Sequence, residues 1–264
     1  MRFFRSNFVF NPTVARRLVA TLALGVASAW LLPACTTVPS ASTGMGAGSF
    51  STVIIDAGHG GMDNGGTGNG LREKDLTLDT ALRVRTELRR AGLRAVLTRE
   101  DDHFVELNDR VAFADHYVGR GAVLVSIHYN ATSRRSASGS ETFFWHANSH
   151  GLATRIEQGL VAAAGTENHG VTRRRLRLTR NPQIPCVLVE CAYVTNPGEA
   201  RRAADAGFRQ SVARGIATGI VEQHERGDAG IAPVPEIQAP LSSEADARSA
   251  RSSGGGKRSR RRHH

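Results

Sequence analysis

The stretch Val53-Ile54-Ile55-Asp56-Ala57-Gly58-His59-Gly60-Gly61 joins a short apolar run to a histidine set among glycines. Residues 53–55 are β-branched, which is typical of a buried strand, and the strand is expected to end where the glycines begin. His59 is therefore predicted to lie at the end of a strand, where open α/β sheets place their sites. The glycines allow positive φ and a close approach of the backbone.

Strands and helices are predicted to alternate along the rest of the chain. Apolar spacing indicates helices at about residues 75–92, 107–117, 152–160 and 208–220. Further strands are predicted at residues 93–98, 122–127, 142–145, 175–179 and 185–190. This alternation predicts an α/β fold whose sheet is covered by helices on both faces.

Composition separates one globular region from two unlike ends. The chain has 264 residues, a formal net charge of +10 and 40% hydrophobic residues, and we expect one domain at residues 51–226. Four arginines precede an uncharged run at residues 18–32, which is short for a membrane span of ~20 residues but suits a secretory signal.

Leu32-Pro33-Ala34-Cys35 follows this run and resembles a bacterial lipobox. We therefore expect residues 1–35 to be a lipoprotein signal peptide, Cys35 to be lipidated and residues 36–50 to be a flexible tether. The alternative is an ordinary cleaved signal in which Cys35 has no role.

The C-terminal residues 227–264 are rich in Pro, Ser and Gly and end in a run of Lys and Arg at residues 257–262. Such a composition buries too little apolar surface to fold, so this segment is predicted to be a disordered basic tail. Anionic envelope polymers or lipid headgroups would suit it as partners, a solvated tail without a partner is the alternative, and nucleic acid is not expected.

Two cysteines remain besides Cys35. If Cys186 and Cys191 both lie on one extended strand, a rise of ~3.3 Å per residue separates them too far for a disulfide. They are expected to be free thiols that serve as buried packing residues.

Four residues have the chemistry of a metal-dependent hydrolase. His59, Glu73 and His128 offer the nitrogen and oxygen donors that zinc prefers, and catalytic zinc sites use three protein ligands with a fourth position open. Glu190 ends an apolar run, and a buried carboxylate is costly without a metal, a partner or a role, which makes it a candidate general base. Each residue alone also fits a structural role, and the combination favours a site.

Segments 55–61, 73–76, 126–131 and 187–197 resemble, in order, the four signature segments of the zinc-dependent N-acetylmuramoyl-L-alanine amidases of bacterial cell walls, the type-3 amidase family. The resemblance covers about residues 51–225. It implies a twisted mixed sheet flanked by helices, one Zn²⁺ ion per chain on His59, Glu73 and His128 at strand ends, and a catalytic role for Glu190. The family cleaves the amide between N-acetylmuramic acid and the L-alanine of the peptidoglycan stem peptide.

The chain departs from the family pattern in places that bear on the substrate. Tyr129 and Cys191-Ala192 replace smaller residues, and residues 131–185 are too few for the inhibitory helix of some division-associated members, so we expect an enzyme that needs no release from such a helix. Arg180 is a candidate for approaching the scissile carbonyl and Asn130 for orienting a ligand. The arginine-rich residues 172–177 are expected either to meet stem-peptide carboxylates or to form a solvated loop.

The sequence thus predicts a monomeric lipoprotein that acts on peptidoglycan from the periplasmic side of the outer membrane, since Thr36 and Thr37 after the lipobox are not acidic. A need for an activating protein is not decided by the sequence. A zinc carboxypeptidase or deacetylase is one alternative, because the same metal and base would serve it. A non-catalytic wall-binding module is another, although the presence of Glu190 argues against it.

Overall fold

A computed structural model describes residues 50–234 of the chain. The expected signal peptide, the lipidation site Cys35, the tether up to residue 49 and the tail from residue 235 onward lie outside the described residues. Of the helices within residues 50–234, none is both long and apolar enough to cross a bilayer.

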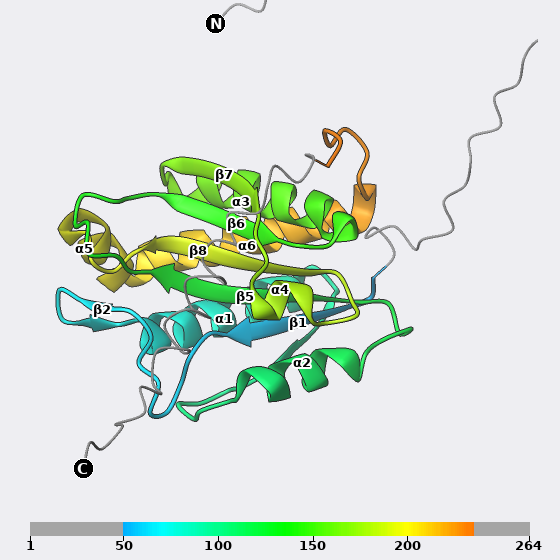
Figure 1. Ribbon diagram of the computed structural model, residues 1–264. Helices are drawn as coiled ribbons and strands as arrows, with labels where there is room; N and C mark the ends of the chain where they lie inside the picture. Colours follow the sequence, from blue (N-terminus) through cyan, green and yellow to red (C-terminus); the bar gives the residue numbers. More distant parts are fainter. Residues whose placement is uncertain (1–49, 235–264) are drawn as a thin grey trace, which may run out of the picture. The chain divides into compact units, whose positions relative to one another are not determined.

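The core of the fold is a six-stranded mixed sheet with strand order β4-β1-β5-β8-β6-β7 (Figure 1). Neighbouring strands from β4 to β8 are parallel, whereas β6 runs antiparallel to β8 and parallel to β7. The strands are β1 (Thr52–Ala57), β4 (Arg94–Leu97), β5 (Ala122–Asn130), β6 (Ser140–Phe144), β7 (Asn168–Arg173) and β8 (Cys186–Tyr193). The short strands β2 (Thr67–Gly68) and β3 (Leu71–Arg72) pair separately. The predicted mixed α/β sheet is confirmed.

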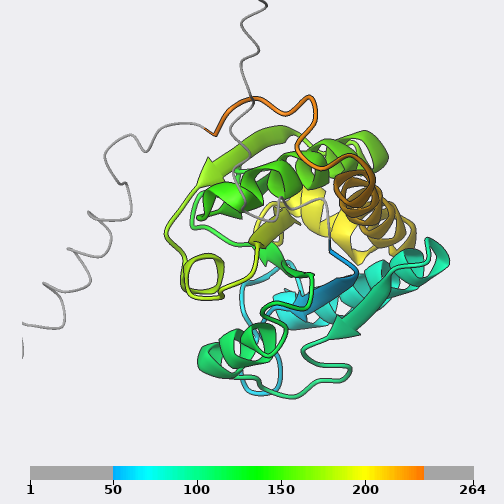
Figure 2. The same ribbon diagram turned by 90° about the vertical axis from the view of Figure 1, so that its right-hand side faces the viewer.

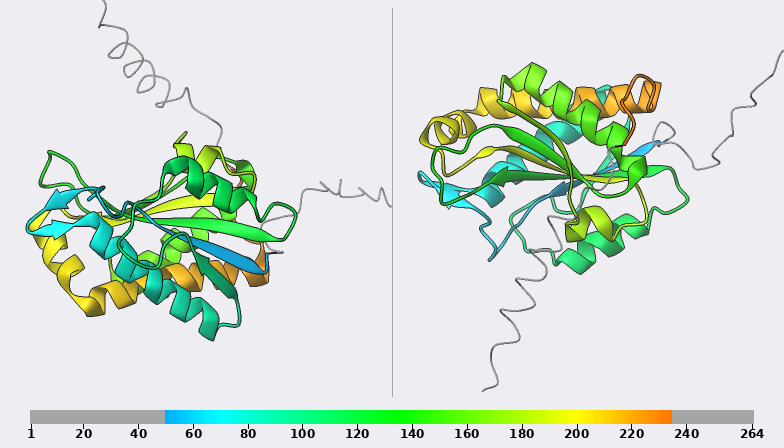
Figure 3. Two further views of the ribbon diagram at one scale, coloured as in Figure 1. Left: turned by 90° about the horizontal axis from the view of Figure 1, so that it is seen from below. Right: turned by 45° about the horizontal axis from the view of Figure 1, so that its top comes forward.

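Helices cover both faces of the sheet, as Figures 2 and 3 show from further sides. One face packs with α1, α3 and α6 through alternate strand residues such as Val53, Val125 and Val187. The other face packs with α2 and α4 through Ile54 and Leu124, among others. The helices are α1 (Glu73–Arg90), α2 (Leu107–Asp115), α3 (His150–Ala164), α4 (Arg177–Arg180), α5 (Pro197–Ala204) and α6 (Ala206–Arg226), with a 3-10 turn η1 (Ala147–Ser149).

The second face is the one that matters for function, because α2 and α4 are short. They bury a small apolar cluster that includes Ala114, Leu178 and Cys186. Beyond this cluster, toward the carboxyl ends of β5 and β8, the sheet carries polar side chains instead of a covering helix.

Several element boundaries differ from the sequence prediction. The strand predicted at residues 175–179 is wrong: this segment holds the helical turn α4, in which the buried Leu178 joins the apolar cluster and the Thr179 hydroxyl donates to the Arg174 and Leu176 carbonyls. Its neighbour β7 was not predicted. Helix α1 begins at Glu73, two residues earlier than expected, so Glu73 belongs to the helix and not to a preceding loop.

The described chain also continues beyond residue 226, where the sequence predicted the domain to end. The buried Arg155 guanidinium donates to the carbonyl oxygens of Gly227 and Ala229, at 3.0 and 2.8 Å, and holds the start of the predicted tail against α3. Between residues 131 and 185 the structure has β6, η1, α3, β7 and α4 and no additional helix.

Candidate active site

The His59 loop follows directly from β1 and is held by buried cations. His59 has a φ of 60°, a left-handed conformation that a non-glycine residue adopts only when its surroundings fix it. The Arg99 guanidinium donates to the carbonyl oxygens of Ala57 and Gly58, both at 2.9 Å. Arg110 donates to the carbonyl oxygens of Ala57 at 2.8 Å and His59 at 2.7 Å. The two arginines therefore fix the backbone on which His59 is mounted.

Asp56 supplies the counter-charge for this arrangement. Its carboxylate is fully buried, forms an ion pair with Arg110, and accepts hydrogen bonds from the hydroxyls of Thr98 and Ser126, both at 2.7 Å. Burial alone would raise the pKa of Asp56, but Arg110 and the two hydroxyls outweigh it and hold the pKa below its ordinary value. Asp56 is thus an ionised anchor beneath the loop.

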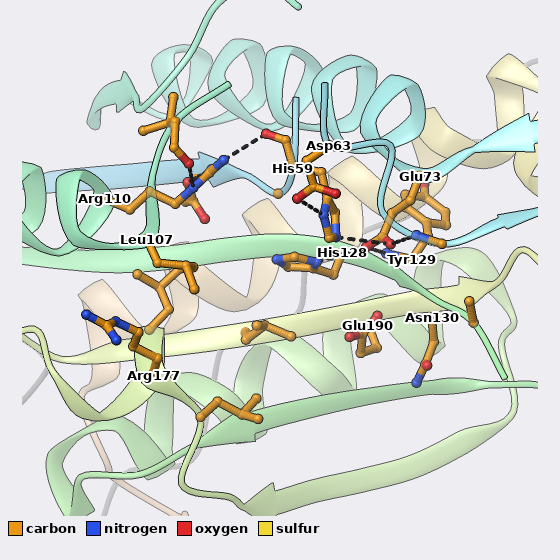
Figure 4. Close-up of a pocket in the computed structure, with 18 of the residues that line it drawn as sticks. His59, Asp63, Glu73, Leu107, Arg110, His128, Tyr129, Asn130, Arg177 and Glu190 are labelled. Carbon is orange, nitrogen blue, oxygen red and sulfur yellow. Dashed lines mark hydrogen bonds and ion pairs between the residues drawn. The ribbon is translucent and has the colours of Figure 1, made fainter. Parts of the chain in front are cut away.

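His59, Glu73 and His128 come together at one point, as the sequence predicts (Figure 4). Glu73 Oε2 lies 3.1 Å from His59 Nε2, and Glu73 Oε1 lies 2.8 Å from His128 Nδ1. One donor atom from each residue can be chosen so that all lie within 4.8 Å of one another, a set that could hold a metal ion. Asp63 accepts a hydrogen bond from the other nitrogen of His59, Nδ1, at 2.8 Å, which orients the ring.

The electrostatics of this cluster favour a cation. Burial would lower the pKa of His59, yet its hydrogen bonds to Glu73 and Asp63 prevail and raise the pKa to about 9. Burial likewise opposes ionisation of Glu73, but the two histidines hold its pKa well below the ordinary range. The cluster therefore binds protons tightly when no metal is present, and a metal ion would take their place. The donor set and its charge both fit a divalent ion.

Glu190 lies beside this cluster on β8, in register with His128 on the neighbouring strand β5. Figure 4 shows its carboxylate directed toward His128. Its Oε2 atom is buried and has no hydrogen-bond partner in the described structure. Burial raises the pKa of Glu190 to about 7, and the nearby histidines only partly offset that effect. A buried carboxylate with an unpartnered oxygen indicates a group that binds a ligand or takes part in a reaction. Strand β8 continues for three residues past Glu190, so this residue is not at the strand end that the sequence predicted.

The four residues line a cleft of about 590 Å³ on the face of the sheet that α2 and α4 leave open. Asn130, proposed from the sequence to orient a ligand, also lines the cleft. Arg180 does not: it lines a separate hollow with His146, whose ring contacts the Arg180 carbonyl oxygen at 2.7 Å. Arg177, one helical turn earlier, lines the cleft in its place.

The roles of Arg99 and Arg110 were not anticipated from the sequence. Both are almost fully buried, with exposed fractions of 1% and 3%. The available signal was Asp56, since an aspartate inside an apolar strand requires a cationic or hydrogen-bonding partner. The sequence does not show which of the many arginines supplies it.

Three side chains that could hold a metal ion and a buried carboxylate share one cleft of a mixed α/β sheet, which is the arrangement that a metal-dependent hydrolase requires. A family model described as N-acetylmuramoyl-L-alanine amidase matches residues 53–222, and the chain belongs to this family. The family expected from the motifs is thus confirmed.

Relatives of known name or structure agree with this membership. The chain is 38% identical over 177 residues to N-acetylmuramoyl-L-alanine amidase LytC of Bacillus subtilis, covering 66% of this chain but only 35% of LytC. Amidase AmiC2 of Nostoc punctiforme is 34% identical with a TM-score of 0.64 over 69% of this chain and 100% of that structure. The catalytic domain of the amidase CwlV of Bacillus (Paenibacillus) polymyxa var. colistinus is 35% identical, with a TM-score of 0.62 over 66% of this chain and 97% of that structure.

Proposed function

We propose that this protein is a zinc-dependent hydrolase that cleaves the amide between N-acetylmuramic acid and the L-alanine of peptidoglycan stem peptides. The observation that carries the proposal is the cluster of His59, Glu73 and His128 facing the unpartnered carboxylate of Glu190 within one cleft. Membership of the N-acetylmuramoyl-L-alanine amidase family supports the choice of bond over the carboxypeptidase and deacetylase alternatives.

In this proposal His59, Glu73 and His128 hold one zinc ion per chain. Zinc, when bound, polarises a substrate carbonyl and lowers the pKa of a coordinated water from ~15.7 to ~7. Asp63 keeps His59 oriented through its Nδ1 atom, and the Tyr129 backbone N–H donates to Glu73 Oε1 at 3.0 Å, so that the ligand side chains are fixed before substrate arrives. These contacts reduce the reorganisation that binding would otherwise require.

Glu190 is proposed as the general base and then the general acid. Its carboxylate takes a proton from the attacking water as the new C–O bond forms, and passes a proton to the alanine nitrogen as the C–N bond breaks. Water and amide are thereby converted into a carboxylic acid and an amine with no net change at Glu190. Because Glu190 Oε2 has no hydrogen-bond partner in the described structure, this carboxylate is free to accept a proton and to return it.

The cellular setting is proposed from the sequence. The lipobox-like residues 32–35 support lipidation at Cys35, and Thr36 and Thr37 support retention on the periplasmic side of the outer membrane. Peptidoglycan is the proposed partner there, and the chain is proposed to act as a monomer.

The test is incubation of the full chain with purified peptidoglycan, with and without a zinc chelator, followed by mass spectrometry of the soluble products. We expect free stem peptides that begin with L-alanine, no release in the presence of chelator, and recovery when zinc is restored. Loss of a terminal amino acid or of an acetyl group would instead identify one of the alternative hydrolases.

A further inference from the structure

The cleft extends well beyond the proposed metal site, along the surface of β8. Side chains at positions 186, 188 and 190 lie on the same face of this strand, because strand residues alternate. The Cys186 thiol donates to the Leu178 carbonyl oxygen at 2.8 Å, which places α4 over Cys186. Glu190 lies four residues farther on, or ~13 Å at ~3.3 Å per residue. Arg177, adjacent to Leu178, therefore stands about that far along the cleft from the proposed base.

This arm of the cleft ends where α2 and α4 contact each other. Behind Leu178 the space is filled by the apolar cluster that packs α2 and α4 on the sheet. The Arg177 guanidinium donates to the side-chain oxygen of Asn108, which joins the two helices across the arm. At the opposite end the cleft is bordered by Ala131, an exposed residue just after β5. The arm is therefore short, and its length suits a peptide of a few residues.

The lining of this arm combines apolar walls with a cation. Leu107, Leu176 and Leu188 provide the walls, and Figure 4 shows Leu107 and Arg177 at the same end of the cleft. The Arg110 guanidinium also borders the cleft, but Asp56 and backbone carbonyls engage it. Arg177 is exposed, and its guanidinium donates to the neutral side-chain amide of Asn108. This contact uses one or two of the five N–H donors of the guanidinium, so the others can bind a ligand.

A guanidinium in this position is suited to a carboxylate, which it can bind with two parallel hydrogen bonds. Glu106 lies on the α2 wall of the same cleft and is exposed. The cleft therefore has no general excess of positive charge at this point, and attraction of an acidic group must come from a direct contact with Arg177.

We propose that Arg177 is a specificity-determining residue that binds a carboxylate of the peptide product, about four residues beyond the scissile amide. An extended peptide advances ~3.3–3.6 Å per residue, so ~13 Å corresponds to about four residues. The inference rests on the proposed function, because it takes the scissile amide to lie at Glu190.

The test compares two muramyl peptides of equal length, one with free carboxylates after the L-alanine and one with those groups amidated. For the full chain we expect amidation to raise KM about two- to fivefold and to leave kcat nearly unchanged, since a partly exposed ion pair contributes binding and not chemistry. Arg177→Gln should cleave both substrates with the higher KM. The matched control is Arg180→Gln, which removes the same group one turn away in the separate hollow and should retain the preference.

Binding to the Glu190→Gln chain, measured by calorimetry, separates this inference from the proposed function. A tighter Kd for the free-carboxylate peptide that disappears in the Glu190→Gln, Arg177→Gln double variant supports the inference even if the wild type cleaves neither substrate. Cleavage of both peptides with equal KM by the wild type, or an Arg177→Gln chain that keeps the preference, would overturn it and leave the amidase proposal intact.

Discussion

Replacement of Glu190 by Gln should stabilise the metal-free protein at alkaline pH, although it removes the proposed catalytic group. In the folded chain burial raises the pKa of Glu190 from an ordinary value of 4.5 to about 7. Between pH 4.5 and pH 7 this carboxyl is therefore protonated in the folded chain and ionised in the unfolded chain. Above pH 7 the folded chain holds an ionised carboxylate whose buried Oε2 atom has no hydrogen-bond partner in the described structure. Glutamine has nearly the same shape and no charge.

The magnitude follows from the two pKa values. A difference between 4.5 and about 7 corresponds to ~3 kcal/mol at 1.36 kcal/mol per pKa unit. Because Glu190 is only half-buried as a residue, we expect about 2–3 kcal/mol above pH 8. Because the pKa of Glu190 is raised in the folded state, Glu190 does not lower the free energy of unfolding of the wild type below pH 4.5. That free energy falls as the pH rises from 4.5 through 7. At pH 5 the expected advantage of the variant is below about 1 kcal/mol.

The assay is urea unfolding of both metal-free chains at pH 5 and pH 8.5. Glu225→Gln, which neutralises an exposed carboxylate in the last turn of α6, is the control and should change stability equally little at both values. An advantage of Glu190→Gln that is the same at pH 5 and pH 8.5, or a less stable variant at pH 8.5, would show that Glu190 is not ionised at a cost in the folded protein.

Two further predictions concern the support of the site. Arg110→Met should lower the free energy of unfolding by about 3–5 kcal/mol near neutral pH, because it leaves the buried Asp56 carboxylate without its cation. Since the pKa of Asp56 is depressed in the folded state, this contribution is present above the ordinary value of 3.8 and is lost as the pH falls below it; urea titrations at pH 7 and pH 3 should show the gap between wild type and variant narrowing in acid. Asp63→Asn should weaken zinc binding by ~10–100-fold, measured by competition with a chromophoric chelator, because the carboxylate that orients His59 is lost. Unchanged zinc affinity with an intact fold would remove that role from Asp63.

The parts of the fold and site that local sequence determines were predictable. An apolar strand that ends in one reactive residue marked both His59 and His128, and the parallel sheet brings such residues to one edge. Glu190 was identifiable because a carboxylate at the end of an apolar run requires an explanation. These inferences used only the neighbours of each residue along the chain.

The parts that depend on distant contacts were not predictable. Asp56 and Arg110 are separated by 54 positions, and nothing near Arg110 distinguishes it from other helix arginines. The turn α4 was mistaken for a strand because its conformation is set by Leu178 packing beneath α2, not by its own β-branched or apolar pattern. Arg180 was proposed because it precedes the Glu190 strand closely in sequence, whereas the structure places Arg177 in the cleft and Arg180 in a separate hollow.

The most direct test of the proposed chemistry is the rate at which zinc-loaded wild type and Glu190→Gln release stem peptides from peptidoglycan, with zinc per chain measured in the same samples. Glu190 is not among the three proposed ligands, so we predict one zinc per chain in both proteins and a rate lower by ~10²–10⁴-fold in the variant. An unchanged rate in a variant that retains its zinc would contradict the assignment of Glu190 as the catalytic base.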